Sequence, residues 1–97
     1  MPTHEEEERF QRDWKRLKRW QKRAFIAAVQ EFAHDLDSGE LRPSLRVMPM
    51  ADHPGIWEMT WEGHDGRATF SYGPETIPGK RHVIWRRVGG HKIFQEP

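Results

Sequence analysis

"GIWEMTWEGHDGRATFSY", residues 55–72, alternates apolar and polar side chains on both sides of a short turn. Successive side chains of a strand point to opposite faces of a sheet, so each half is predicted to be a strand with one apolar face. The Asp-Gly step at 65–66 is typical of a tight hairpin turn. The apolar rows of this β-hairpin are Trp57, Met59 and Trp61 before the turn and Ala68, Phe70 and Tyr72 after it.

The residues before the hairpin follow a helical period instead. Apolar residues recur every three or four positions and predict helices over roughly 6–18 and 21–37. No strong breaker separates them, so they form either a helical hairpin or one bent helix. Gly39 suits the left-handed position that ends a helix.

Two further strands are predicted, over Leu45–Met50 and His82–Val88. For the acidic residues 1–8 we expect no strand: the four glutamates lie outside regular structure or cap the first helix, where carboxylates are favourable. The two helices must cover the apolar face of the hairpin. The sequence therefore predicts a single α+β domain over residues 1–97, with two N-terminal helices packed on one face of a small, mainly antiparallel sheet.

Composition limits the class of protein. The 97 residues include no cysteine, and the start MPTHEEEERF lacks the apolar stretch of a signal peptide. No apolar run approaches the roughly 18 residues of a membrane span, so we expect a cytoplasmic protein without a membrane partner. The net charge of +1 is unevenly distributed, because residues 9–23 hold eight Lys and Arg against Asp13. This block suits either a polyanionic or acidic partner or a solvated helix face.

The polar face of the hairpin carries the candidate site. The alternation places Glu58 and Arg67 on this face, either as a surface salt bridge or as part of an anion site. Arg86 or Arg87 joins them, but the alternation of the last strand does not decide which. His91, just beyond a Gly-Gly step, adds an acid or base at the rim. The histidines lack ligand spacing, so we predict no metal site.

The order of helices, strand, hairpin and strand resembles the RelE/ParE toxin superfamily of bacterial toxin–antitoxin systems. "GIWEMTWEGHDGRATFSY" resembles the hairpin of that family, and "HVIWRRVGGHKIF", residues 82–94, resembles its last strand, Gly step and C-terminal segment. "FQRDWKRLKRWQKRAFIAAVQEFAHDLDSG", residues 10–39, resembles its two helices. Members of the family usually open with a strand, which residues 1–8 do not predict.

The resemblance implies a RelE-like mRNA interferase, a cofactor-free endoribonuclease that in many members works on the ribosome. The 2′-hydroxyl of the RNA attacks the adjacent phosphate, which requires a base, cations for the phosphorane charge and an acid for the leaving oxygen. A cognate antitoxin is the implied protein partner. Two alternatives stay open: a ParE-like toxin that binds a protein such as DNA gyrase, and an inactive binding member of the fold.

By position, the resemblance implies particular roles. Arg67 binds phosphate, His91 protonates the leaving oxygen, and Glu58 is the base or orients Arg67. The RNA-binding residues implied by position or by charge are Arg46, Arg86, Arg87, Lys92 and, by stacking on a base, Phe94.

Overall fold

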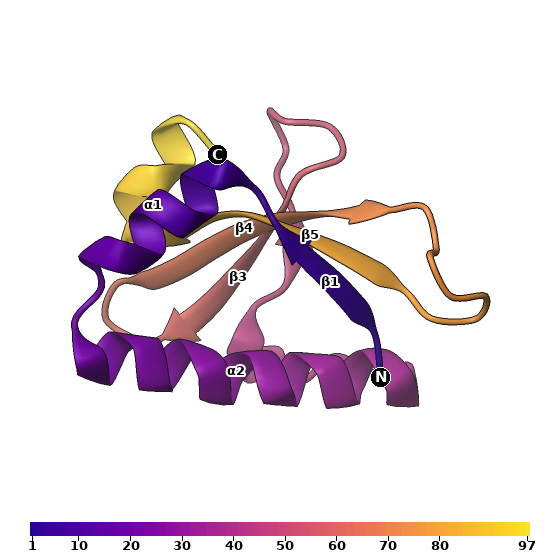
Figure 1. Cartoon of the computed structure of the whole chain (residues 1–97). Helices are drawn as coiled ribbons and strands as arrows, with labels where there is room; N and C mark the ends of the chain where they lie inside the picture. Colours follow the sequence, from indigo (N-terminus) through magenta and orange to yellow (C-terminus); the bar gives the residue numbers. More distant parts are fainter.

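The computed structural model describes residues 1–97 as five strands, two α-helices and two short 3₁₀ helices (Figure 1). The elements are β1 (Thr3–Glu6), α1 (Glu8–Arg16), α2 (Arg19–Ser38), η1 (Pro43–Leu45), β2 (Met48–Pro49), β3 (Trp57–Glu62), β4 (Gly66–Gly73), β5 (His82–Gly89) and η2 (His91–Gln95). The sheet has the order β1-β5-β4-β3-β2. All neighbouring strands are antiparallel except β1 and β5, which confirms the predicted α+β class.

The core lies between the sheet and the helices. Figure 1 shows α2 along the lower side of the sheet, with α1 and η2 at its upper left. The predicted apolar face is the inner one, since Met59, Ala68 and Phe70 are fully buried. Phe25 and Phe32 of α2 pack edge-on or tilted against Trp85 and Phe70, which builds an aromatic core.

The two helices are separate elements. Leu17 and Lys18 both have extended backbone, so the chain turns between α1 and α2. The Lys18 N–H donates to the Gln21 side-chain oxygen at 2.7 Å, which satisfies a free donor at the start of α2. Gly39 ends α2 at φ 87°, the predicted left-handed conformation. Neither helix has a stretch long and apolar enough to cross a membrane.

The prediction for the N-terminal residues was wrong. Thr3–Glu6 form β1, a parallel edge strand in register with His82–Trp85 of β5. Buried His82 holds the two strands together, because its ring nitrogens contact the Thr3 hydroxyl and the Glu5 carboxylate, each at 2.7 Å. The strand partner lies nearly eighty residues away, and an acidic edge strand needs no apolar alternation.

The predicted strand over Leu45–Met50 was also largely wrong. Residues Pro43–Leu45 form η1, and only Met48–Pro49 pair with β3. Arg46 separates the two elements at φ 47°, in the left-handed region. Beyond Pro49 only the Met50 N–H still donates to β3's side, to the Ile56 carbonyl at 2.9 Å, before the chain turns back toward β3 over residues 51–55.

Candidate functional site

His91 is held by Asp65 of the β3–β4 turn. The Asp65 carboxylate accepts the His91 backbone N–H at 3.0 Å and also contacts the His91 ring at Nδ1. Both side chains are exposed, and the contact leaves the other ring nitrogen, Nε2, without a partner. The hairpin turn and the segment after β5 therefore meet in an Asp–His pair with one ring nitrogen facing solvent.

Gly90 makes this pairing possible. A Cβ at position 90 would come within 2.9 Å of the Asp65 carboxyl carbon and closer still to its oxygen. Any side chain there would displace Asp65 from His91. Glycine at position 90 is thus required by the close approach of Asp65.

Asp65 is ionised near neutrality. The hydrogen bonds that it accepts from His91, first from the backbone and then from the ring, lower its pKa below the usual value. An ionised carboxylate can only accept hydrogen bonds, so Nδ1 of His91 is the donor in this contact. Nε2 is then the nitrogen that can exchange a proton with a substrate.

Arg67 comes two residues after Asp65, at the start of β4, and pairs across the sheet with Gly89 of β5, two residues before His91. Its Nη1 donates to the carbonyl oxygens of Glu62 and Gly66, at 3.1 and 3.0 Å, which folds the side chain over the turn. Its Nε and Nη2 donate to no protein group. Two of the three guanidinium nitrogens thus remain available for an anion beside the Asp65–His91 pair.

Glu58 lies on the same sheet face as Arg67 but does not bind it. Glu58 pairs across the sheet with Thr69, and Arg67 pairs with Thr60, so the two charged residues are diagonal neighbours. No ion pair joins them, which removes the salt-bridge interpretation. Glu58 is half-buried, and its carboxylate has no hydrogen-bond partner within the protein.

Both Arg86 and Arg87 point to the polar face. A β-bulge shifts the register between β4 and β5, so that Thr69 pairs with Arg87 while Phe70 pairs with Trp85. Arg86 is the extra residue of the bulge, which lets two adjacent side chains share one face. In a regular strand only one of these two adjacent side chains could lie on this face, as the alternation alone predicted.

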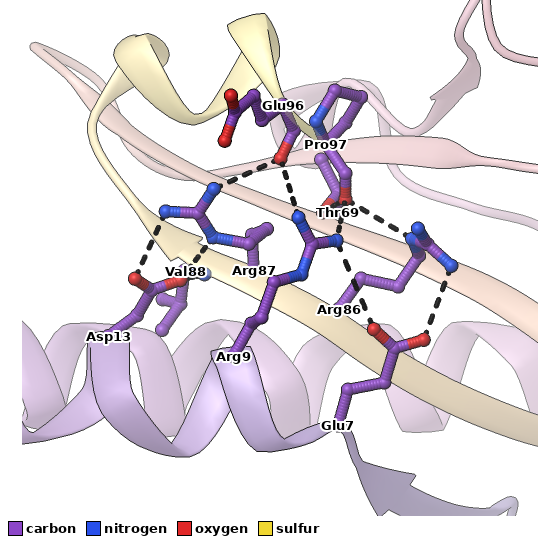
Figure 2. A network of polar contacts seen from close by, with 9 residues as sticks. All are labelled: Glu7, Arg9, Asp13, Thr69, Arg86, Arg87, Val88, Glu96 and Pro97. Atoms are coloured by element: carbon purple, nitrogen blue, oxygen red, sulfur yellow. Dashed lines mark hydrogen bonds and ion pairs between the residues drawn. The ribbon is translucent and has the colours of Figure 1, made fainter.

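These arginines hold the segment after β5 against the sheet (Figure 2). Arg86 donates to the Pro97 carbonyl at 3.1 Å and Arg87 to the Glu96 carbonyl at 3.0 Å, and Arg9 of α1 bonds both carbonyls. Buried Thr69 also donates to Pro97. Part of the polar face is therefore covered by residues 91–97 rather than open.

Acidic residues complete this network. Asp13 accepts from Arg87 Nε at 2.6 Å, from Arg87 Nη2 at 3.1 Å and from the Val88 N–H at 3.2 Å. The Asp13 carboxylate raises the pKa of Arg87 above its usual range. Glu7 similarly accepts from Arg86 at 3.2 Å. Arg86 and Arg87 are thus engaged in ion pairs that join α1, β5 and the chain end.

The other predicted RNA-binding residues occupy different positions. Lys92 and Phe94 lie in η2 beside His91, the lysine exposed and the phenylalanine half-buried. Arg46 is exposed before β2, the edge strand of the sheet beyond β3. The structure therefore gathers Asp65, Arg67, His91 and Lys92 and leaves Arg46 outside this group.

Sequence reasoning missed Asp65 and Asp13. Asp65 was interpreted only as part of the Asp-Gly turn. Its carboxylate also binds His91, which the turn sequence does not indicate. Asp13 did carry a signal, since it is the single acid among eight basic residues in 9–23. It also lies three residues after Phe10, on the apolar face of the helix, where a carboxylate needs a partner.

No family model and no curated protein matches this chain. Among solved structures it is similar to YafQ of E. coli. A crystal structure of the DinJ–YafQ complex matches with a TM-score of 0.59 and 16% identity over 95% of this chain and 96% of that one. A second crystal structure, of the E. coli DinJ–YafQ toxin–antitoxin complex, matches with a TM-score of 0.60 and 14% identity, over 94% of this chain and 93% of that one. The crystal structure of an E. coli YafQ mutant, with a histidine replaced by glutamine, matches with a TM-score of 0.59 and 14% identity, over 97% of this chain and 98% of that one. The chain therefore shares the fold of YafQ over almost its whole length.

Proposed function

We propose that this chain is the toxin of a type II toxin–antitoxin system, an endoribonuclease that cleaves mRNA on the ribosome. The observation that carries the proposal is the Asp65–His91 pair beside Arg67, placed on a fold shared with YafQ. An acid or base next to a guanidinium with free donors matches what phosphodiester cleavage requires. The site of action is the cytoplasm, where mRNA is translated.

In the proposed reaction the RNA supplies its own nucleophile. Glu58 takes the proton of the 2′-hydroxyl, and the 2′-oxygen attacks the adjacent phosphorus. Arg67 donates to the phosphorane oxygens through Nε and Nη2. His91 gives a proton from Nε2 to the departing 5′-oxygen, while Asp65 keeps the ring oriented through Nδ1. The products are a 2′,3′-cyclic phosphate and a 5′-hydroxyl.

The remaining cations and η2 support RNA binding in this proposal. Lys92 adds positive potential next to His91, and Phe94 offers a ring to a neighbouring base. Arg46 contacts the RNA backbone farther along the sheet. Arg86 and Arg87 act first by fixing the segment that carries His91, and they meet phosphate only at the edge of that segment.

An antitoxin is the proposed protein partner, as DinJ is for YafQ in the complexes above. A groove of about 490 Å³ between α1, α2 and β1 is suited to it. Phe10, Trp14 and half-exposed Ile26 line this groove, and Lys15 lies on its rim. An antitoxin segment with apolar and acidic side chains complements this surface. Coexpression of an antitoxin encoded beside this chain should relieve any growth arrest.

Induced expression in a bacterium tests the proposed function. Wild type and His91→Ala are compared for growth and for the 5′ ends of cellular mRNA. Growth arrest with new, His91-dependent ends inside coding regions is expected. Arrest without new ends would refute the ribonuclease and indicate a protein target, and growth without arrest would refute the toxin.

A further inference from the structure

A second cavity, of about 350 Å³, lies next to the Asp65–His91 pair. It is bounded by the start of α2, by the β3–β4 turn, by Gly89 at the end of β5 and by Gly90 after it. In Figure 1 the start of α2 lies below this turn. Its size falls within the roughly 300–1,000 Å³ of small-molecule sites. Whatever occupies it lies beside the proposed cleavage site.

Trp20 is the aromatic side chain of this cavity that faces solvent. Its exposed fraction is 53%, although it lines the cavity wall. The buried residues of α2 follow Phe25, Ala28 and Phe32, and Trp20 is not part of that row. The core therefore gives no reason for a tryptophan here. A half-exposed indole ring is a ready surface for stacking a base.

The opposite side of the cavity offers hydrogen-bond acceptors. Glu62 and Asp65 line it, and the hydrogen bonds that they accept lower the pKa of both carboxyl groups. Glu62 accepts the backbone N–H groups of His64 and Asp65 at 2.9 and 3.2 Å, one on each oxygen. Each oxygen keeps a further acceptor position. A ligand edge with adjacent N–H donors fits this wall.

Cations precede Trp20 in the chain. Arg16 ends α1, Lys18 lies in the connection and Arg19 begins α2, and all three are exposed without an ion pair. None of them lines the cavity, but all lie within four residues of Trp20. Their charge favours the phosphate of a base stacked on Trp20, which offsets the two carboxylates in the cavity wall.

We propose that this cavity is a nucleobase subsite for the RNA substrate, with Trp20 as its stacking platform and guanine as its preferred base. Guanine presents two adjacent donors, N1–H and the N2 amino group, to the carboxylate wall, whereas uracil presents one donor between two acceptors. The proposal rests on the proposed function for the identity of the substrate. It adds the part of the protein that selects the nucleotide next to the cleaved bond.

Nucleotide titrations test the subsite without any cleavage. The ¹⁵N-labelled protein is titrated with 5′-GMP, with 5′-UMP and with ribose 5-phosphate, which carries the phosphate but no base. We expect GMP to bind more tightly than either of the others and to shift the indole N–H signal of Trp20. Trp20→Ala should weaken GMP binding roughly 5- to 150-fold, equivalent to about 1–3 kcal/mol of stacking. Trp20→Phe should retain most of the affinity.

A matched control separates stacking from general loss of apolar surface. Ile77→Ala removes a side chain of similar exposure, 50%, from the β4–β5 loop at the other end of β5 and should leave GMP binding unchanged. Thermal unfolding of each variant verifies its fold. Unchanged GMP affinity in Trp20→Ala, or GMP that binds no better than ribose 5-phosphate, would overturn the subsite. Equal affinity for GMP and UMP would overturn its guanine preference.

Cleavage assays of wild type and Trp20→Ala, run beside the titrations, keep this proposal distinct from the proposed function. Trp20→Ala should lose GMP affinity but keep its fold, because Trp20 lies outside the buried row of α2. Trp20-dependent GMP binding by a protein that cuts no RNA would retain the subsite and remove the ribonuclease. Cleavage of RNA by a protein in which Trp20→Ala leaves GMP binding unchanged would retain the ribonuclease and remove the subsite.

Discussion

Asp13→Ala should be among the most destabilising substitutions in this chain. The Asp13 side chain is only 10% exposed and its partner Arg87 only 18%. Truncation removes the two hydrogen bonds to Arg87, leaves that guanidinium without its counter-charge and deprives the Val88 N–H of its acceptor. Removing one partner of a buried ion pair costs about 3–5 kcal/mol. A domain of this size has a total stability of about 5–15 kcal/mol.

The assay is thermal and urea unfolding at neutral pH. For a domain of 60–100 residues, each kcal/mol lowers Tm by about 4–8 °C, so the loss should lie between roughly 12 and 40 °C. Glu8→Ala is the control, since it removes the same charge from α1 where the side chain is 84% exposed. It should change stability by less than about 1 kcal/mol.

A double variant tests the physical cause. Asp13→Ala combined with Arg87→Met removes the unpaired buried charge and should be more stable than Asp13→Ala alone. The reasoning is refuted if Asp13→Ala unfolds at the same temperature as the Glu8→Ala control. It is also refuted if the double variant loses as much unfolding free energy as the two single variants lose together.

Three further substitutions probe the core, the acid stability and the site. Phe32→Ala should cost about 3–5 kcal/mol in urea unfolding, because this ring is 1% exposed and lies 5.0 Å from that of Phe70; a loss below 1 kcal/mol would contradict the packing described. Hydrogen bonds from Arg42 lower the pKa of Asp35 from 3.8 to about 2, so Asp35 stabilises the fold above pH 4 and this contribution disappears as the pH falls toward 2. Asp35→Asn should therefore be less stable than wild type at pH 6 and nearly equal to it at pH 2, and a difference that is the same at both pH values would exclude this linkage. Arg67→Ala should lower the rate of RNA cleavage by about 10²–10³, or 2.7–4 kcal/mol, as for the loss of one transition-state donor; unchanged turnover would leave Arg67 with a structural role only.

The hairpin could be predicted because its signals are local. Two alternating segments and an Asp-Gly turn determine which face of β3 and β4 is buried, and the structure has that face inward. The same holds for α2, where helical spacing and Gly39 agree. In both places, neighbouring residues carry the information about which side is apolar.

The edge strand β1 could not be found in this way. Its hydrogen bonds go to β5, and Thr3 and Glu5 point toward His82 from the other end of the chain. The bulge at Arg86 had a weak signal: buried Val83 and Trp85 are two residues apart, but buried Val88 follows Trp85 after three. This change of phase indicates an extra residue in the strand.

For the candidate site, the sequence indicated residue types but not the contacts between them. His91 and Arg67 do lie near one another, since Arg67 pairs with Gly89 across the sheet and His91 follows two residues later. Asp65, which orients His91, comes from the turn of the hairpin. The residues of a turn indicate its backbone conformation but not the contacts of its side chains. Likewise, the arginines at 86 and 87 have protein partners that come from α1 and the chain end.

The most direct test of the account is single-turnover cleavage of ribosome-bound mRNA by wild type, His91→Ala and Asp65→Ala, with analysis of the product ends. For the proposed ribonuclease we expect a 2′,3′-cyclic phosphate from wild type, no cleavage with His91→Ala, slower cleavage with Asp65→Ala, and an intact message when the nucleotide at the cut lacks its 2′-hydroxyl. Cleavage by His91→Ala at the wild-type rate would contradict it.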